Sequence, residues 1–401
     1  MHYILALVGN FFSPHNLPMT NTPPSLLQML VELIAVPSMS SVSPEFDTDN
    51  MGVIHLLAEW CRGLGFEVEV MPLPNQPHKA NLIATLGSGP GGLVLAGHTD
   101  TVPYDEGRWN HDPFRLTEQQ GRLYGLGTSD MKGFFALAIE AAKAFDKDTL
   151  KQPLILLATA DEESSMEGAR ALVDSGRPRA RYAVIGEPTG MRPVNAHKGI
   201  MMEGITLTGR SGHSSDPSLG VSALEGMHRV IGDLLAWREE LQARHRDPRF
   251  KVPVPTLNLG HIHGGDNPNR ICGCCTLHID LRPVPGMGLD ELRDTLNKRL
   301  HTLLGESQLG WEVHRLFEGT PSMHTPDTSA IVQAAEKLTG FDSEAVAFCT
   351  EGPYLNELGM ETIILGPGDI DQAHQPDEFI ALDRLQPTVT LLDGLIRRFC
   401  L

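Results

Sequence analysis

The sequence predicts an α/β protein in which a helix-covered sheet is interrupted by a smaller α+β domain. Short apolar runs such as LVLAG and LILLATA end at glycine or polar residues, and stretches with helical periodicity lie between several of them. This alternation is typical of a largely parallel sheet between layers of helices. The chain has 401 residues, which exceeds the usual size of one domain, so we expect two domains.

The elements of the sheet domain follow from local patterns along the chain. PSLLQMLVELIAV at 24–36 predicts an amphipathic helix with proline in its first turn, and MGVIHLLAEWCRG at 51–63 predicts a second helix. Apolar runs with the length of strands then lie at 66–73, 80–87, 92–97, 154–160, 182–188 and 362–365. Two more helices are predicted at 327–338 and near 384–399.

A different order of elements occupies the middle of the chain. It reads strand, helix, strand, strand, helix and strand, which is the order of a split βαβ or ferredoxin-like unit. We therefore predict an inserted domain at 196–312, with 20–195 and 313–401 forming the sheet domain. Residues 1–19 are predicted to be disordered or a misassigned start, with Met19 as the alternative initiator.

The composition excludes some classes of partner. The 50 acidic residues outnumber the 32 basic ones, giving a net charge of −18 that would repel nucleic acid. The same charge suits a site that attracts cations, although acidity that only keeps the protein soluble is an equal alternative. The apolar segment MHYILALVGNFF is too short for a membrane span and lacks the basic residues of a signal peptide, so no membrane partner is expected.

The six cysteines do not have the spacing of a disulfide framework, which favours a reduced, cytoplasmic protein. Cys272, Cys274 and Cys275 are close enough in sequence to suggest a metal cluster. They lie in the strand-like stretch ICGCCTLHIDLRP, however, and we interpret them as core residues because cysteine is often buried.

Metal-binding residue types follow the ends of the predicted strands. In open α/β sheets, ligands bind beyond the carboxyl ends of the strands. Carboxylates crowded at one such edge would raise one another's pKa, and divalent cations remove that conflict. The candidate residues at this edge, including one that precedes a predicted helix, are His98, Asp100, Asp130, Glu162, Glu163, Glu187 and His374.

Two histidines with three carboxylates suit two zinc-like ions better than one, since a single catalytic zinc takes three protein ligands. Asp130 is the candidate for a carboxylate that bridges two ions. Asp100 is placed to accept the second imidazole N–H of His98, or else to cap the chain. Glu162 and Glu163 point to opposite sides in an extended segment, so one can bind metal while the other faces a water as general base. A glycosidase would need two separated carboxylates, which this pair fits poorly.

The motifs GHTDTVP, GTSDMKG, ATADEE, GEPT, SGHSS and QAHQPDE resemble those of the two-zinc aminoacylase/carboxypeptidase family. The resemblance runs from about residue 25 to 400, and HGGDNPNRIC and FCTEGPY narrow it to members that deacetylate an amino acid. It implies a zinc-exopeptidase-like catalytic domain and an inserted lid and dimerisation domain. The implied activity is that of a metal-dependent amidohydrolase of amino-acid biosynthesis, with two Zn²⁺ or Co²⁺ ions.

Carried over residue by residue, the resemblance assigns His98 and Glu187 to one metal ion and Glu163 and His374 to the other. Asp130 would bridge the two ions.

The same carry-over gives the remaining roles at this edge. Glu162 would be the general base, and Asp100 would orient His98. The family also implies a cis peptide bond between Asp130 and Met131. Lys132 follows this bond, and a helix surface is the expected place for it.

The inserted domain carries further candidates. His213 in SGHSS would donate to the oxyanion in the partner subunit's site, which implies a homodimer; a surface-turn histidine is the alternative. Arg270, with Asn258 and Asn269, would bind the substrate carboxylate, or Arg270 would form a structural ion pair. Glu351 would contact a substrate ammonium or order its loop.

Three other functions compete with hydrolysis of an N-acetylated amino acid. A broader N-acyl-amino-acid deacylase or dipeptidase would use the same metal ions. A metal-binding scaffold without catalysis would have lost Glu162 or a ligand, and all are present. An amino-acid-binding module would have no use for the adjacent glutamates beside a metal set.

Overall fold

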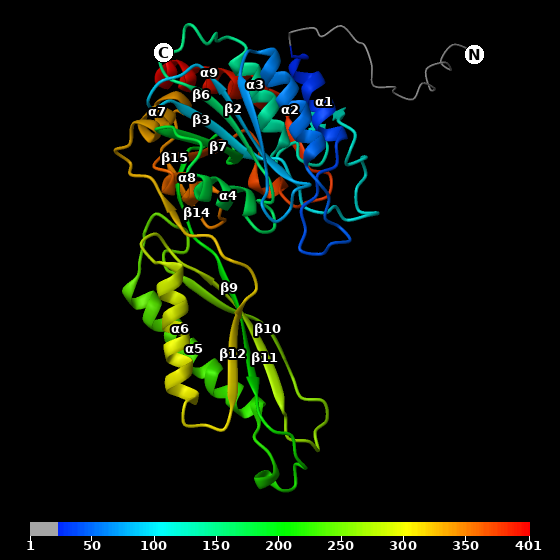
Figure 1. Ribbon diagram of the computed structural model, residues 1–401, viewed down its shortest axis with the longest axis vertical. Helices are drawn as coiled ribbons and strands as arrows, with labels where there is room; N and C mark the ends of the chain where they lie inside the picture. Colours follow the sequence, from blue (N-terminus) through cyan, green and yellow to red (C-terminus); the bar gives the residue numbers. More distant parts are fainter. Residues whose placement is uncertain (1–22) are drawn as a thin grey trace, which may run out of the picture.

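The computed structural model describes residues 23–401, which form a large domain and an elongated small domain (Figure 1). The prediction for residues 1–19, including Met19 as an alternative start, lies outside the described residues. Within 23–401, no helix combines the length and the apolar character needed to cross a membrane.

A nine-stranded mixed sheet forms the centre of the large domain. Its path is β1 (Glu67–Pro72), β2 (Ala80–Leu86), β6 (Leu154–Thr159), β3 (Leu93–His98), β7 (Tyr182–Pro188), β15 (Glu361–Gly366), β8 (Val194–His197) and β13 (Met323–His324), with β14 (Glu344–Val346) beside β8. The neighbours β6, β3, β7 and β15 run parallel. Every residue of β3, β6 and β7 is buried, as expected for parallel strands covered on both faces.

Helices cover both faces of this sheet (Figure 1). One face packs against α1 (Leu26–Ala35), α2 (Met51–Gly63), α3 (Lys132–Ala142), α7 (Ala330–Thr339) and α9 (Leu385–Cys400), and the other against α4 (Glu167–Ser175) and α8 (Gly352–Glu357). Strand alternation explains the two layers, because Leu95 joins the first core while Val94 and Ala96 join the second.

The small domain has the predicted ferredoxin-like order. Its antiparallel sheet runs β10 (Thr256–Gly264), β11 (Cys274–Arg282), β9 (Met201–Thr208) and β12 (Gly310–Arg315). The helices α5 (Ala223–Arg244) and α6 (Leu289–Leu304) cover one face around a separate apolar core. The α/β fold with an inserted α+β domain is therefore confirmed.

The borders of the small domain differ slightly from the predicted 196–312. Ala196 and His197 belong to β8 of the large sheet, and β12 continues to Arg315. The two crossings between the domains lie side by side, because Ile200 and Thr320 exchange backbone hydrogen bonds of 2.8 and 3.0 Å.

Sequence reasoning missed a three-stranded sheet formed by β4 (Thr117–Gln119), β5 (Arg122–Tyr124) and β16 (Phe379–Ala381). Cys272 and Cys275 are core residues as expected, whereas Cys274 is exposed because it faces the opposite side of β11. Lys132 is not on a helix surface. It is fully buried, and its ammonium donates to the carbonyls of Leu33 and Val36 at the end of α1.

Candidate metal centre

Four parallel strands deliver the candidate ligands to one edge of the large sheet. His98 ends β3, Glu163 follows β6, Glu187 lies near the end of β7, and His374 follows β15. These strands are neighbours, so their carboxyl ends meet. Asp130 joins them from the loop that leads into α3.

The carboxylate of Asp130 lies between two imidazoles. Its Oδ1 is 3.2 Å from Nε2 of His98, and its Oδ2 is 3.6 Å from Nε2 of His374. Each oxygen thus faces a different histidine, which is the arrangement a bridging ligand requires. The peptide bond between Asp130 and Met131 is cis, as the family resemblance implied.

Each imidazole also faces a second carboxylate. Nε2 of His98 is 3.7 Å from Oε1 of Glu187, and Nε2 of His374 is 2.9 Å from Oε2 of Glu163. Glu162 lies within one metal-sized group with His98 and Glu187. The donors are imidazole nitrogens and carboxylate oxygens, which suit divalent ions such as zinc. The residues therefore fit a two-metal centre.

Burial and charge act strongly on these groups. Burial raises the pKa of Glu162 well above its usual range, with a further contribution from Glu187, and raises that of Glu187 itself to about 8. Burial opposes a charge on His98, but Glu187 and Asp130 outweigh it and raise the pKa of His98 well above its usual value. The hydrogen bond that His374 donates to the Glu163 carboxylate raises the pKa of His374 to about 9. So many carboxylates in one place favour the binding of cations.

Asp100 contacts His98 differently from the prediction. The ring Nδ1 of His98 lies 2.9 Å from the backbone carbonyl of Asp100, whereas the carboxylate Oδ1 is 3.7 Å away. The acceptor is thus a main-chain group two residues beyond His98, the last residue of β3. With its proton on Nδ1, His98 presents the Nε2 lone pair to a metal. The Asp100 carboxylate instead accepts the amide N–H of Glu163 at 3.0 Å.

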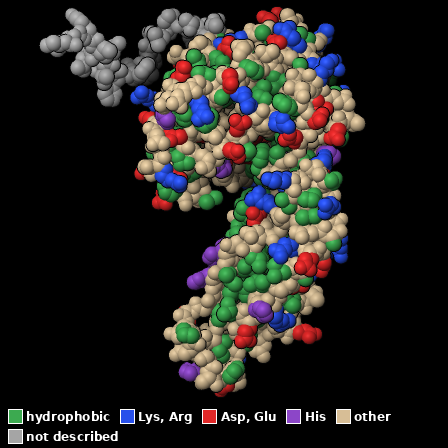
Figure 2. All heavy atoms as spheres, turned by 180° about the vertical axis from the view of Figure 1, so that it is seen from behind, with side chains coloured by type: hydrophobic (Ala, Val, Ile, Leu, Met, Phe, Trp, Pro, Cys, Tyr) green, Lys and Arg blue, Asp and Glu red, His purple; other side chains and the backbone are tan. Residues whose placement is uncertain are grey.

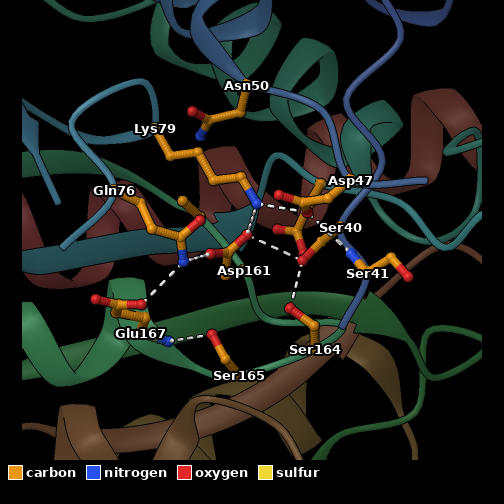
Figure 3. A network of polar contacts seen from close by, with 12 residues as sticks. Ser40, Ser41, Asp47, Asn50, Gln76, Lys79, Asp161, Ser164, Ser165 and Glu167 are labelled. Carbon is orange, nitrogen blue, oxygen red and sulfur yellow. Dashed lines mark hydrogen bonds and ion pairs between the residues drawn. The ribbon is translucent and has the colours of Figure 1, made fainter. Parts of the chain in front are cut away.

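A buried polar network holds the turn that carries Glu162 and Glu163 (Figure 3). Asp161 has a left-handed backbone conformation, with φ of 59°, and its carboxylate lies 2.7 Å from the ammonium of Lys79. Lys79 also contacts Asp47 at 2.7 Å, and Gln76 donates to Asp161. Sequence reasoning missed Lys79, because a lysine before a strand carries no motif.

A second buried carboxylate holds the loop of Asp130. Glu378 accepts the backbone amides of Gly127, Ser129 and Asp130 at 3.0, 2.7 and 3.0 Å. Burial raises the pKa of Glu378 to about 8. The QAHQPDE motif contains both His374 and Glu378, but sequence reasoning singled out only the histidine.

The predicted residues of the small domain lie elsewhere. The loops 209–222 and 265–273, which we call the tip, lie at the end away from the large domain (Figure 1). His213 pairs with Arg270 there, the amide of Ser214 donates to the carbonyl of Asn269, and Arg270 forms an ion pair with Asp266. The chain itself thus does not bring the tip residues to the metal centre.

Asn258 does not join Arg270. It lies opposite Asp280 on β10, and six residues of strand, about 20 Å, separate it from the end of β10 at the tip. The hairpin thus places Asn258 and Arg270 of one chain at different heights, and their joint binding of the substrate carboxylate stays a prediction.

Three further groups lie near the centre, namely Glu351, Cys349 and, from the small domain, Arg282. Glu351 is buried, its Oε2 accepts from Thr159 at 2.6 Å, and its Oε1 has no partner among residues 23–401. Burial raises the pKa of Cys349 to about 12, and Glu162, Arg282 and Glu187 also act on that thiol. Arg282, at the end of β11, was missed because it lies in an ordinary strand pattern.

Comparisons with known proteins agree with this geometry. Residues 94–398 match the model of peptidase family M20/M25/M40. The chain is 51% identical to the acetylornithine deacetylase of Edwardsiella ictaluri (strain 93-146), over 94% of this chain and 98% of that protein. It is 49% identical to the acetylornithine deacetylase of Pasteurella multocida (strain Pm70), with the same coverage of 94% and 98%.

Solved structures share the fold at low identity. A tripeptidase from Staphylococcus aureus has a TM-score of 0.71 at 20% identity, covering 93% of this chain and 97% of its own. An M20 family metallo-carboxypeptidase from Sulfolobus solfataricus has a TM-score of 0.71 at 18% identity, covering 93% and 99%. A dinuclear metal-binding M20 peptidase from Bacillus subtilis has a TM-score of 0.64 at 15% identity, covering 93% and 97%.

Proposed function

The chain belongs to peptidase family M20/M25/M40, a family of metal-dependent hydrolases, and we propose that it hydrolyses N-acetylornithine to ornithine and acetate. This reaction is a step of arginine biosynthesis. The observation that carries the proposal is the position of Asp130, whose two oxygens face two imidazoles that each have a further carboxylate beside them. The curated relatives at about half identity support the choice of substrate.

We assign the metal ligands as predicted. His98 and Glu187 would hold one ion, Glu163 and His374 would hold the other, and Asp130 would be shared between them. Two Zn²⁺ or Co²⁺ ions, when bound, supply positive charge that polarises the acetyl carbonyl and acidifies a water.

Glu162 moves the proton. As general base it takes a proton from the attacking water, and it then gives that proton to the leaving α-amino group. Burial raises the pKa of Glu162, which makes its ionised carboxylate a stronger proton acceptor than that of an exposed glutamate. Asp100 positions the ligands through its carbonyl on His98 and its carboxylate on the amide of Glu163.

Substrate recognition is assigned to both domains. Arg270 and Asn269, at the tip, bind the substrate carboxylate, and His213 donates to the oxyanion. The tip is about 25 Å of strand away from the domain crossing, so these contacts are made in the partner subunit of a homodimer. Asn258 is also assigned to substrate binding, from the outer face of β10. Glu351, with its unpaired oxygen, attracts the side-chain ammonium of ornithine.

The proposal includes a cytoplasmic location and small-molecule substrates only, without nucleic acid or membrane partners. The net charge of −18 supports the absence of nucleic-acid partners.

The experiment is acetate release from N-acetylornithine by the purified protein, before and after chelation and readdition of zinc or cobalt. Glu162→Gln should lower kcat by about 10²–10⁴-fold while both metal ions stay bound. Glu59→Gln, at an exposed position of α2, is the matched control and should leave kcat unchanged. Hydrolysis of N-acetylmethionine or a dipeptide but not N-acetylornithine would keep the chemistry and discard the substrate. Stoichiometric metal without any hydrolysis would favour a scaffold.

A further inference from the structure

Four histidines project from the outer face of the small sheet, the face that α5 and α6 do not cover. On β10, His261 and His263 are two residues apart, and His261 lies opposite His278 of β11. Ile262 lies between them and opposite Leu277, whose side chain points into the core of the small domain. His314 of β12 lies in the same row across the sheet. Figure 2 shows histidine side chains gathered along one margin of the small domain.

The rings are close together and unpaired. The centroids of His261 and His278 are 4.8 Å apart, and those of His278 and His314 are 6.4 Å apart. Residues 23–401 provide no hydrogen-bond or ion-pair partner for any of the four imidazoles. His261 and His263 are exposed, and His278 and His314 are half-buried. The ring nitrogens are therefore free to bind a ligand.

A glycine makes room in this row. Gly204 of β9 lies between His278 and His314, and a Cβ placed on it would be 2.3 Å from Nε2 of His314. The ring of His314 thus lies over the bare backbone of β9, on the side that faces His278. Any side chain at this position would separate the two histidines.

The chemistry of the group favours a metal ion. Burial and the neighbouring rings of His261 and His314 lower the pKa of His278, so its imidazole stays neutral near pH 7. Neutral imidazole is the ligand form of histidine. Two histidines separated by one residue on a strand, with a third opposite, place three nitrogens on one side of the sheet. The three ring nitrogens do not converge on one point in the structure, so side-chain rotations must bring them to about 2.0–2.1 Å from one ion.

We propose that the outer face of the small sheet binds one borderline divalent transition-metal ion, Zn²⁺, Ni²⁺ or Cu²⁺, through His261, His263 and His278, with His314 beside them. Three imidazoles and no carboxylate select these ions over Mg²⁺ or Ca²⁺. This site is distinct from the centre at the edge of the large sheet, because its ligands come from β10, β11 and β12.

The test is calorimetric titration of Zn²⁺ into the full chain after it has received two equivalents of zinc, with bound zinc counted by elemental analysis. The wild-type protein should take up one more equivalent than His278→Ala, and His261→Ala should lower the affinity for that equivalent at least tenfold. His228→Ala, at an exposed position on the opposite, helical side of the small domain, is the matched control and should keep the extra equivalent. Because the readout is a difference between variants, it does not depend on how many ions the large domain holds.

Equal zinc uptake by wild type, His261→Ala and His278→Ala would overturn the proposal. His278→Gln is a second variant, should alanine disturb the sheet, and circular dichroism confirms folding. With Cu²⁺ as the probe, the electron paramagnetic resonance spectrum should show nitrogen hyperfine splitting that weakens in His261→Ala. A copper spectrum with oxygen ligands alone would also contradict the site. Hydrolysis of N-acetylornithine should be unchanged in His261→Ala and in His278→Ala.

Discussion

Lys79 shows what a single buried charge does in this protein. Its ammonium is the cation paired with Asp161, and both side chains are almost fully buried. Lys79→Met would leave Asp161 buried without a counter-charge, next to Glu162. We expect a loss of about 3–5 kcal/mol in the free energy of unfolding, measured by urea denaturation.

The matched control is Arg108→Met, which breaks an exposed ion pair with Asp105. Exposed pairs contribute about 0–1 kcal/mol, so the control should change stability little. Equal effects of the two substitutions would show that burial of the pair does not matter.

His197 should make stability depend on pH. It is buried, its Nδ1 donates to the carbonyl of Lys198, and its Nε2 accepts from the amide of Thr350. Burial lowers its pKa from 6.5 to about 4. Between these values the unfolded chain binds the proton and the folded chain does not, so stability falls as pH falls from 6.5 to 4.

His197 should add a slope of about 1.4 kcal/mol per pH unit to the plot of unfolding free energy against pH in this window. His197→Asn removes the titration, and its unfolding free energy should depend less on pH in this window than that of the wild type. His228→Asn, at an exposed position, should keep the wild-type slope. An unchanged slope in His197→Asn would contradict the assignment.

At the level of residues, sequence reasoning located what strand ends determine. The structure brings His98, Asp130 and Glu163 together as expected, since parallel strands end at one edge. Sequence reasoning could not foresee that the backbone carbonyl of Asp100 accepts from the ring of His98, because the direction of a carbonyl depends on the local backbone angles. It also placed Lys132 on a surface, because burial of a lysine by two helix-end carbonyls leaves no sequence pattern.

The packing of α3 on the sheet depends on a glycine of β7. A Cβ on Gly186 would lie 2.0 Å from the ring of Phe134 in α3. Gly186→Ala should therefore push α3 from the sheet and lower the free energy of unfolding by about 1–3 kcal/mol. Gly232→Ala in α5 meets no atom within 4 Å and should stabilise the protein by about 0.5–1 kcal/mol, by the higher helix propensity of alanine.

Thermal or urea unfolding of both variants checks this pair. If Gly186→Ala left the free energy of unfolding unchanged, Phe134 would be able to move aside without cost.

The long elements were predictable and the short ones were not. The helix at 51–63 was placed at its observed bounds because its apolar residues repeat with helical spacing. The strands β4, β5 and β16 have three residues each, too few to show alternation. β4 and β5 pair as a local hairpin, whereas β16 joins them only because the chain returns after His374, which is a tertiary event.

For the whole molecule, the distance of the tip from the metal centre makes the dimer proposal testable. Glu162→Gln and His213→Ala would each inactivate a homodimer. If His213 acts in the partner's site, a mixed dimer has one site with both defects and one with neither. Mixing, unfolding and refolding the two variants together should then restore about one quarter of wild-type activity.

Each variant refolded alone is the control and should stay inactive. No recovery in refolded mixtures that contain mixed dimers would place His213 in the site of its own subunit.

The hydrogen bonds between Ile200 and Thr320 also mark a place where the small domain can be deleted from the chain. Because these residues pair across neighbouring strands, removal of 201–319 leaves two ends only about 5 Å apart, which a two-residue turn can join. The shortened polypeptide keeps the entire nine-stranded sheet and all proposed metal ligands, so it should fold by circular dichroism and bind zinc while failing to turn over substrate. An aggregated product would mean that the insert is needed for the sheet to form. In the expected case, the small domain is a transplantable module that can be exchanged between relatives to move substrate preference without rebuilding the metal centre.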